Sequence, residues 1–460
     1  MNSENPSRPH PGQLPDDGAE ARFLALWRRF WNDREPVQPQ ARSFLLGVAR
    51  AALGEQAYRA RYDEISAAEA TEAEPREEAP PPTPEEEEEF RRSRFLDRIH
   101  GCLLGGAVGD AFGARIAFMD IAAIREKHGP QGFVDPGPFP KRVDHATSNT
   151  QMTLFTLSGL IGAYDLARRR EPDAARRTAA LYAYLSWLHT QGTPWRDLWP
   201  EDKRELLPRE PDGWLVNEPA LHAERNPNPT CVAALRLFGQ TGRRGTLDAP
   251  LNDAKDAGAL VRSAPIALWS DSPTEVFRAA VELAVLTHGH PTAYLSAGAF
   301  TVICHALLRR ESLPDAVREA VDQARHWPGH EETLTALTRA TESAERGALT
   351  PEEIETELGS GESADSALAI ALHAALARPD SFTDAVVLAA NHSGRSDHSA
   401  ALCGSLMGIQ HDVAGIPWQW WEPLDLRFLV EEIAKDARSA FTVFSRRHGH
   451  DRRMIERYPR

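Results

Sequence analysis

The stretch RIHGCLLGGAVGDAFGARIAF, residues 98–118, decides the fold, because it places five glycines in a pattern that is otherwise apolar and helical. Glycine costs about 1 kcal/mol in a helix interior, so its repeated use indicates close approach of a backbone, a helix or a ligand. Tight helix packing and ligand approach are equally open explanations. Asp110 lies within the run, and a lone carboxylate among glycine and alanine must be paired or hydrogen-bonded.

Outward from this stretch, almost the whole chain after Phe90 has the three- and four-residue period of helices. Clear examples are LYAYLSWL (181–188), AFTVICHALL (299–308) and SALAIALHAAL (366–376). No sustained alternating β-branched run competes with them, and the turn signals fall between the helical segments. We therefore expect an all-α domain with long loops at 129–146 and 191–230.

The N-terminal part divides by composition into three segments. Residues 1–20 are polar and proline-rich, and we expect them to be disordered. Residues 21–68 have helical periodicity but cannot form a core alone, so this extension should pack on the main domain or on a partner. Residues 69–90 form an acidic Pro/Glu linker whose glutamates could also begin the next helix. The main domain then spans 91–460.

Charge and cysteine usage restrict the function classes. The net charge of −15 argues against a nucleic-acid partner, which would require a basic face. The four cysteines are widely spaced, a pattern typical of buried thiols in a reducing compartment. There is no signal peptide and no run of about 18 apolar residues, so we expect a cytoplasmic protein with no membrane span.

Four polar turns each lead into a helix of small residues. They begin HATSNTQMTL (145–154), NDAKDAGALVRSAPIAL (252–268), LTHGHPTAYLSAGAF (286–300) and AANHSGRSDHSAALCGSLMG (389–408). Helix starts and the loops before them are the groups with which a helical fold lines a polar pocket. These turns are therefore the candidate site.

Together, these blocks resemble the ADP-ribosylglycohydrolase family. The resemblance runs from about Arg98 to Ala437 and rests on six blocks in the family's order. They are GCLLGGAVGDAFGA, TSNTQMTLFTLSGLI, DGWLVNEPALHAERNPNPTC, NDAKDAGALVRSAPIAL, THGHP and NHSGRSDHSAA. The resemblance implies a compact orthogonal multi-helix fold and a two-magnesium enzyme that removes ADP-ribose from proteins and small molecules.

Several positions depart from the family's pattern. The family usually has Thr-Asp-Asp-Thr in the second block, where this chain has Thr147, Ser148, Asn149 and Thr150. A glutamate that commonly follows the first block corresponds to Ala117. Three carboxylates near the implied metals are therefore missing from these two blocks.

The last block departs further. The family reads close to HSGDSDST there, and the first aspartate is Arg395 in this chain. The second survives as Asp397, and the next position is His398, with Ser399 as a displaced hydroxyl. Magnesium requires oxygen ligands with negative charge, whereas a guanidinium cannot be deprotonated. We therefore predict that the binuclear magnesium site is lost and that the protein uses no cofactor.

The positions that the resemblance assigns to the ligand also differ. The glycine-rich turn that approaches the diphosphate reads Asp256-Ala257-Gly258, and Asp256 would repel a phosphate if it faced the pocket. It could instead turn outward to Lys255 or Arg262. The ligand-binding candidates are Asp256, Gly258, His392, Ser393 and Gly394.

The charge of Arg395 leaves alternatives open. It could pair with Asp397 or Asp110, or bind a phosphate bidentately, and we favour internal pairing. His145, His392 and His398 could form a transition-metal site, although single loop histidines more often make ordinary hydrogen bonds. His288 and His290 fit structural roles at a helix junction.

Two functions compete. The first is a pseudoenzyme that acts by binding ADP-ribose or a protein, as a scaffold or an inhibitor of an ADP-ribosyltransferase, with the N-terminal extension as the contact surface. The second is an active ADP-ribosyl hydrolase that uses His398 or Asp397 as general base without the usual metals, on a modified protein or small molecule. We favour the first, because the second needs a replacement mechanism for which the sequence shows no assembled residue set.

Overall fold

The computed structural model describes residues 84–134, 146–167, 172–206, 208–441 and 457–458. Within these ranges the chain is helical and contains no strand, with one isolated bridge between Asp256 and Ser363. The predicted all-α class is confirmed. The predicted disordered segment (1–20), the extension (21–68) and the linker up to residue 83 lie outside the described residues.

Fifteen α-helices are described, separated by short connections and a few 3-10 turns. The α-helices are α4 (Pro84–Ala114), α5 (Ile121–His128), α6 (Ser148–Ala167), α7 (Pro172–Thr190), α8 (Pro229–Thr241), α9 (Pro273–Ala284), α10 (Pro291–Leu308), α11 (Leu313–Ala324), α12 (Glu331–Glu345), α13 (Pro351–Glu357), α14 (Ala364–Ala377), α15 (Phe382–Ala390), α16 (Ser396–His411), α17 (Trp418–Trp421) and α18 (Arg427–Phe441). The 3-10 helices are η1 (Trp195–Leu198), η2 (Glu201–Leu206), η3 (Leu215–Asn217), η4 (Pro219–His222), η5 (Ala264–Leu268) and η6 (Val413–Gly415).

Two segments predicted as linker or loop contain helical turns, and for the first of them the sequence also allows a helix start among the glutamates. Helix α4 begins at Pro84, so the last part of the predicted linker is the first turns of the domain's longest helix. Proline is favoured in the first turn of a helix, and glutamates there complement the helix dipole. The predicted loop at 191–230 contains the four 3-10 helices η1 to η4.

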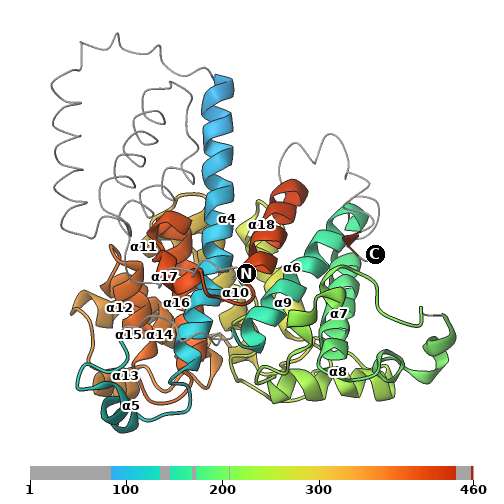
Figure 1. Ribbon diagram of the computed structural model, residues 1–460, viewed down its shortest axis with the longest axis horizontal. Helices are drawn as coiled ribbons and strands as arrows, with labels where there is room; N and C mark the ends of the chain where they lie inside the picture. Colours follow the sequence, from blue (N-terminus) through green and yellow to red (C-terminus); the bar gives the residue numbers. More distant parts are fainter. Residues whose placement is uncertain (1–83, 135–145, 168–171, 207, 442–456, 459–460) are drawn as a thin grey trace, which may run out of the picture. The chain divides into compact units, whose positions relative to one another are not determined.

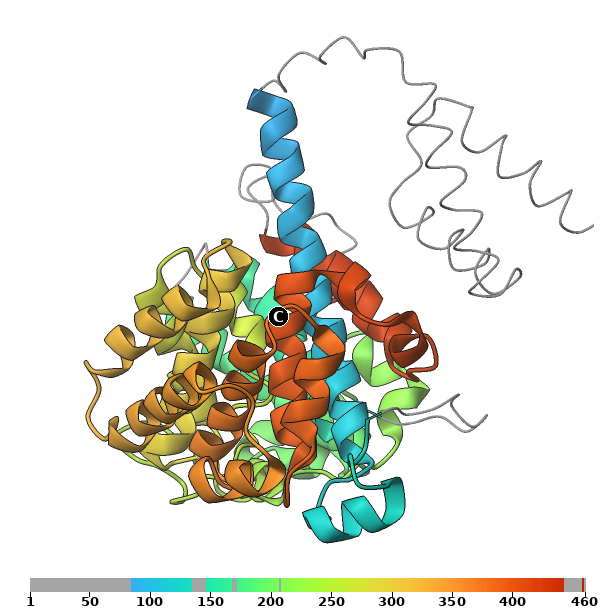
Figure 2. The ribbon, with the colours of Figure 1, turned by 90° about the vertical axis from the view of Figure 1, so that its left-hand side faces the viewer.

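Helix α16 packs side by side with the C-terminal half of α4 (Figures 1 and 2). A Cβ built on Gly105 would lie 2.2 Å from the carbonyl oxygen of Gly404, and one on Gly404 would lie 2.1 Å from that of Gly105. Gly101 meets Gly408 in the same way, and Gly109 meets Ala400. Residue numbers rise along α4 while those of the contacting residues fall along α16, so the two helices are antiparallel. The glycine run therefore serves close helix packing.

The remaining helices surround this pair. Helix α18 packs on α4 and α6, α6 packs on α7, and α14 and α15 pack on α16 (Figure 1). One connected hydrophobic core runs through these helices. The end of α4 and the starts of α6 and α16 come together as a result, because Asp110 hydrogen-bonds to α6 and Gly113 contacts Ser396.

Helix α10 corrects one expectation. With 18 residues and a mean hydropathy of 1.3, it is long and apolar enough to cross a membrane, although we expected no such run. In the structure 94% of it is buried against other helices, including α9, α11 and α14. A core helix of a large helical domain is apolar on all sides for this reason.

We predict that Gly105→Ala lowers the free energy of unfolding by about 1–3 kcal/mol, because the new Cβ would overlap the Gly404 carbonyl and force the helices apart. Gly106→Ala is the matched control in the same helix. Its Cβ would meet mainly the side-chain oxygen of Ser405, which can rotate, so we expect a change within about 1 kcal/mol. Denaturant unfolding followed by circular dichroism measures both, and equal effects would contradict the packing role of Gly105.

Candidate functional site

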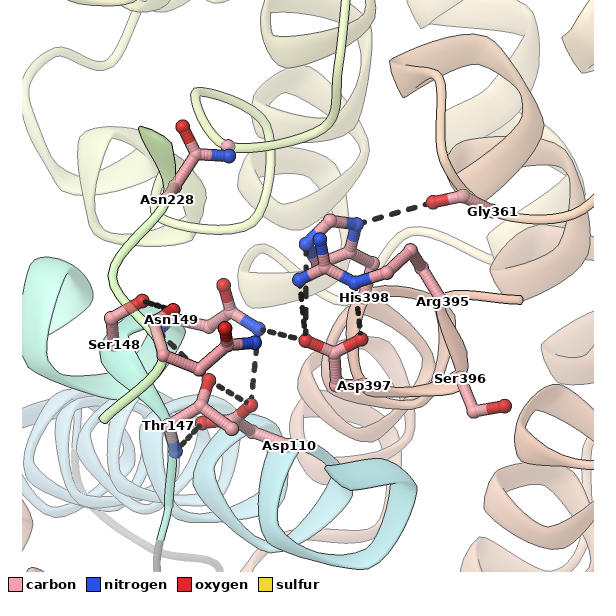
Figure 3. A network of polar contacts seen from close by, with 12 residues as sticks. Asp110, Thr147, Ser148, Asn149, Asn228, Gly361, Arg395, Ser396, Asp397 and His398 are labelled. Carbon is pink, nitrogen blue, oxygen red and sulfur yellow. Dashed lines mark hydrogen bonds and ion pairs between the residues drawn. The ribbon is translucent and has the colours of Figure 1, made fainter. Parts of the chain in front are cut away.

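Three polar segments meet where α4 ends and where α6 and α16 begin (Figure 3). Asp110 comes from α4, residues 147–150 from the start of α6, and residues 395–398 from the start of α16. Asp110, Asn149 and Asp397 are all buried. The structure thus brings together residues that are up to 288 positions apart, as the resemblance implies.

The Asp110 carboxylate accepts five hydrogen bonds from the first turn of α6. Thr147 donates its backbone N–H and its hydroxyl, each at 2.7 Å. Thr150 donates its N–H at 3.3 Å and its hydroxyl at 2.6 Å, and Asn149 Nδ2 donates at 3.1 Å. Burial raises the pKa of Asp110 to about 6, against the effect of these hydrogen bonds. Asp110 is therefore the anion that a helix N-terminus attracts.

Asn149 links the two carboxylates of the site. Its Nδ2 donates to Asp110 Oδ1 and to Asp397 Oδ2, at 3.1 Å each. Figure 3 shows the amide lying between them. At a position where the resemblance implies a metal-binding carboxylate, this chain has a neutral donor.

Arg395 pairs with Asp397, as we favoured from the sequence. Its Nε donates to Asp397 Oδ1 at 2.9 Å and its Nη2 donates to Oδ2 at 2.8 Å. Burial acts to raise the pKa of Asp397, but the adjacent His398 and the guanidinium outweigh it and hold that pKa well below its usual value. The guanidinium also lies 4.7 Å above the ring of Phe118, which is 64% exposed.

The other departing positions do not supply metal ligands to this cluster. The Ser148 hydroxyl donates to the carbonyl of Asn226 at 2.9 Å. His398 Nδ1–H donates to the Gly361 carbonyl at 3.1 Å, and its buried Nε2 has no hydrogen-bond partner. Burial lowers the pKa of His398, although the adjacent Asp397 acts to raise it. Ala117 lies in the turn after α4 and contributes only a methyl group.

Asp256 turns toward its own neighbours and is 33% exposed. It accepts hydrogen bonds from Asn228, Thr230, the Gly258 backbone N–H and His288. Burial acts to raise its pKa, but His288 and the other donors hold it well below the usual value. The alternative outward turn is not found, since Lys255 pairs with Glu332 and Arg262 bonds to Thr287. A fixed negative charge therefore stands at the position that the resemblance assigns to the diphosphate turn.

The three ligand candidates before α16 hold the loop rather than join the cluster. His392 is buried, with Nε2 2.7 Å from Ser399 Oγ. The Ser393 hydroxyl donates to Glu355 at 2.9 Å. Gly394 has a φ of +112°, and a Cβ there would lie 2.4 Å from the Ser360 carbonyl oxygen. Only glycine fits this position.

Two of the three histidines in the predicted transition-metal set, His392 and His398, lie in the described part of the chain. His145, one member of the predicted histidine set, lies outside the described residues. His392 and His398 have the different partners given above. Across the part of the chain that the structure describes, no group of three or more His, Cys, Asp or Glu side chains is placed to hold a metal ion.

Two residues of the site were missed from the sequence. Phe118 has a φ of +66° and stands exposed over Arg395, and no sequence signal marks such a conformation. Asn228 caps α8 by accepting from the Cys231 N–H and also donates to Asp256. Its place before proline and threonine at a helix start is a recognisable capping signal.

We predict that Asp110→Asn lowers the free energy of unfolding by about 2–4 kcal/mol, because an amide NH₂ would face the Thr147 and Thr150 donors. Asp120→Asn is the matched control, since Asp120 accepts one bond, from the Ala123 N–H at an exposed helix cap. It should change stability by less than about 0.5 kcal/mol. Urea unfolding at pH 7.5 compares the two, and a tolerant Asp110→Asn would show that the five-bond arrangement does not stabilise the domain.

Comparison with known proteins agrees with the fold. A family model described as ADP-ribosylglycohydrolase matches residues 91–449. A solved structure described as an ADP-ribosylglycohydrolase-related protein complex is 22% identical, covers 76% of this chain and 100% of its own, and has a TM-score of 0.51, which shows the fold. No curated protein matches the chain. Since the family model spans most of the sequence, the chain belongs to the ADP-ribosylglycohydrolase family.

Proposed function

We propose that the protein is a catalytically inactive member of its family that acts by binding. The observation that carries this proposal is the bidentate pair between Arg395 and Asp397, in which a permanent cation holds the one family carboxylate of the last block that the chain retains. An Arg–carboxylate pair of this geometry is among the stronger hydrogen-bonded contacts. Because both of its oxygens accept hydrogen bonds from Arg395, Asp397 is not available as a metal ligand or a general base.

The charge of the cluster supports loss of the magnesium pair. Magnesium prefers an octahedron of oxygen ligands, usually with carboxylates to balance its charge. Of the two carboxylates in the cluster, Asp110 is saturated by α6 and Asp397 by Arg395 and Asn149. Repulsion between a guanidinium and a divalent ion a few ångströms away costs several kcal/mol even at an effective dielectric near 20. The residues present do not fit the two-metal group.

The ligand is either ADP-ribose or a protein, such as an ADP-ribosyltransferase or an ADP-ribosylated protein. Arg395 with the exposed Phe118 ring is a surface that could hold an anionic or aromatic group. The fixed charge of Asp256 acts against a diphosphate nearby. We therefore favour a protein partner, to which the chain acts as a scaffold or inhibitor.

One observation favours the alternative of an active, metal-independent hydrolase. His398 Nε2 is buried, lacks a partner and lies 3.9 Å from Asp397 Oδ2, so it could accept a proton. The nearby Arg395 guanidinium is already paired with Asp397, and His398 Nε2 is buried in the protein. The activity test below separates the two functions.

We predict no release of ADP-ribose above the buffer rate when the full chain is incubated with ADP-ribosylated arginine or serine peptides in Mg²⁺ or Mn²⁺, because no water-activating metal pair can form. An active relative assayed in parallel is the positive control. Release that Asp397→Ala abolishes would overturn the inactive reading, and release that only His398→Ala abolishes would establish the metal-independent alternative.

Binding is tested by calorimetric titration of the full chain with ADP-ribose. We expect weak or undetectable heat because of Asp256, and Asp256→Asn should increase any affinity, since the substitution removes the negative charge and keeps the side-chain shape. Affinity in the micromolar range in the unmodified chain would instead identify an ADP-ribose-binding protein.

A further inference from the structure

We infer that the Arg395 guanidinium and the Asn149 amide together take the place of metal cations as partners of the two remaining carboxylates, so that the site is stable without any metal. This inference rests on the proposed loss of the magnesium pair. It adds that Asn149 and Arg395 stabilise the site together, and that the contribution of each depends on the same pair of carboxylates. They hold the carboxylates that remain after the metals are lost.

Asp110 and Asp397 need such partners because they are two buried carboxylates that lie close together. Asp110 and Asp397 are 0% and 1% exposed. Each has an oxygen 3.1 Å from the same Asn149 nitrogen. Those oxygens are thus no more than about 6 Å apart, a distance at which like charges in a dry site repel unless they are neutralised.

Both carboxylates find their partners within this chain. Asp397 receives the guanidinium on both of its oxygens and the Asn149 amide on one of them. Asp110 accepts the second hydrogen bond of the Asn149 amide. It also accepts hydrogen bonds from the first turn of α6, including two from backbone N–H groups. The third nearby carboxylate, Asp256, is held by its own donors, among them His288. No carboxylate of the cluster is left to bind a cation.

The arrangement also explains why Asn149 is an amide in particular. A carboxylate there would face Asp110 and Asp397 with acceptors only, whereas the amide offers one donor to each. In the absence of a metal, an aspartate at 149 would therefore add a third negative charge with no donor to share. Asn149 and Arg395 therefore both reduce the repulsion between Asp110 and Asp397, the first by donating to each and the second by pairing with Asp397.

The test is thermal unfolding of the full chain at pH 7.5, in EDTA and in millimolar Mg²⁺. Asn149→Asp preserves the shape and should lower Tm by about 5 °C or more in EDTA. The matched control is Asn217→Asp, where the exposed amide donates to the Gly213 carbonyl, and we expect less than about 2 °C. The unmodified chain should show no shift with Mg²⁺.

A second pair of variants decides the question if Asn149→Asp does not fold. Arg395→Gln keeps hydrogen-bond donors but removes the charge, and it should lower Tm by about 3 °C or more. Adding Asp397→Asn removes the charge that needed neutralising, so the double variant should regain most of the loss. A role in shape alone would leave the two losses additive.

The inference is overturned if Asn149→Asp is as stable as the unmodified chain, or if the Arg395→Gln loss is not rescued by Asp397→Asn. A rise in Tm of the unmodified chain with Mg²⁺ that disappears in Asp397→Ala would also overturn it. These outcomes are separable from the activity test. Metal-free release of ADP-ribose would refute the proposed function and leave the charge compensation intact.

Discussion

The contact on which the structure depends is the backbone-to-backbone approach of α4 and α16. Glycines at four-residue steps leave no side chains between the two helices, and the closest pairs involve carbonyl oxygens. A Cβ on Gly113 would lie 2.2 Å from the Ser396 carbonyl oxygen, so the end of α4 is held against the start of α16. Asp110 lies one turn before Gly113, and Asp397 follows Ser396. The glycine contact thus sets how close the two carboxylates come.

Because the two carboxylates lie so close together, the stability of the site depends on the groups that offset their charges. Buried carboxylates must be paired or hydrogen-bonded, and in the two-metal site that the resemblance implies, bound cations would do this. This chain achieves it with Arg395, Asn149 and the first turn of α6. A helix N-terminus ordinarily offers its N–H groups to an anionic ligand. Here the N–H groups of Thr147 and Thr150 already donate to Asp110, so the start of α6 binds a carboxylate of the protein itself.

Residue identity predicted much of this site. The carboxylate of Asp110 required hydrogen-bond donors, and the guanidinium two residues before Asp397 made an internal pair the favoured outcome. Both were found. The directions of Asp256 and His392 could not be predicted. Asp256 depends on Asn228, Thr230 and His288, which lie 26 to 32 positions away, and His392 depends on the exact start of α16.

The sequence by itself therefore determined the all-α class, the family and the inventory of charges at the site, because helical period, ordered blocks and residue types are local properties. Only the tertiary structure decided that the glycines contact a helix and not a ligand, that α10 is a core helix, and that one amide bridges Asp110 and Asp397. Each of these depends on which distant segment lies opposite. That choice is made by packing of the whole core, which no local pattern encodes.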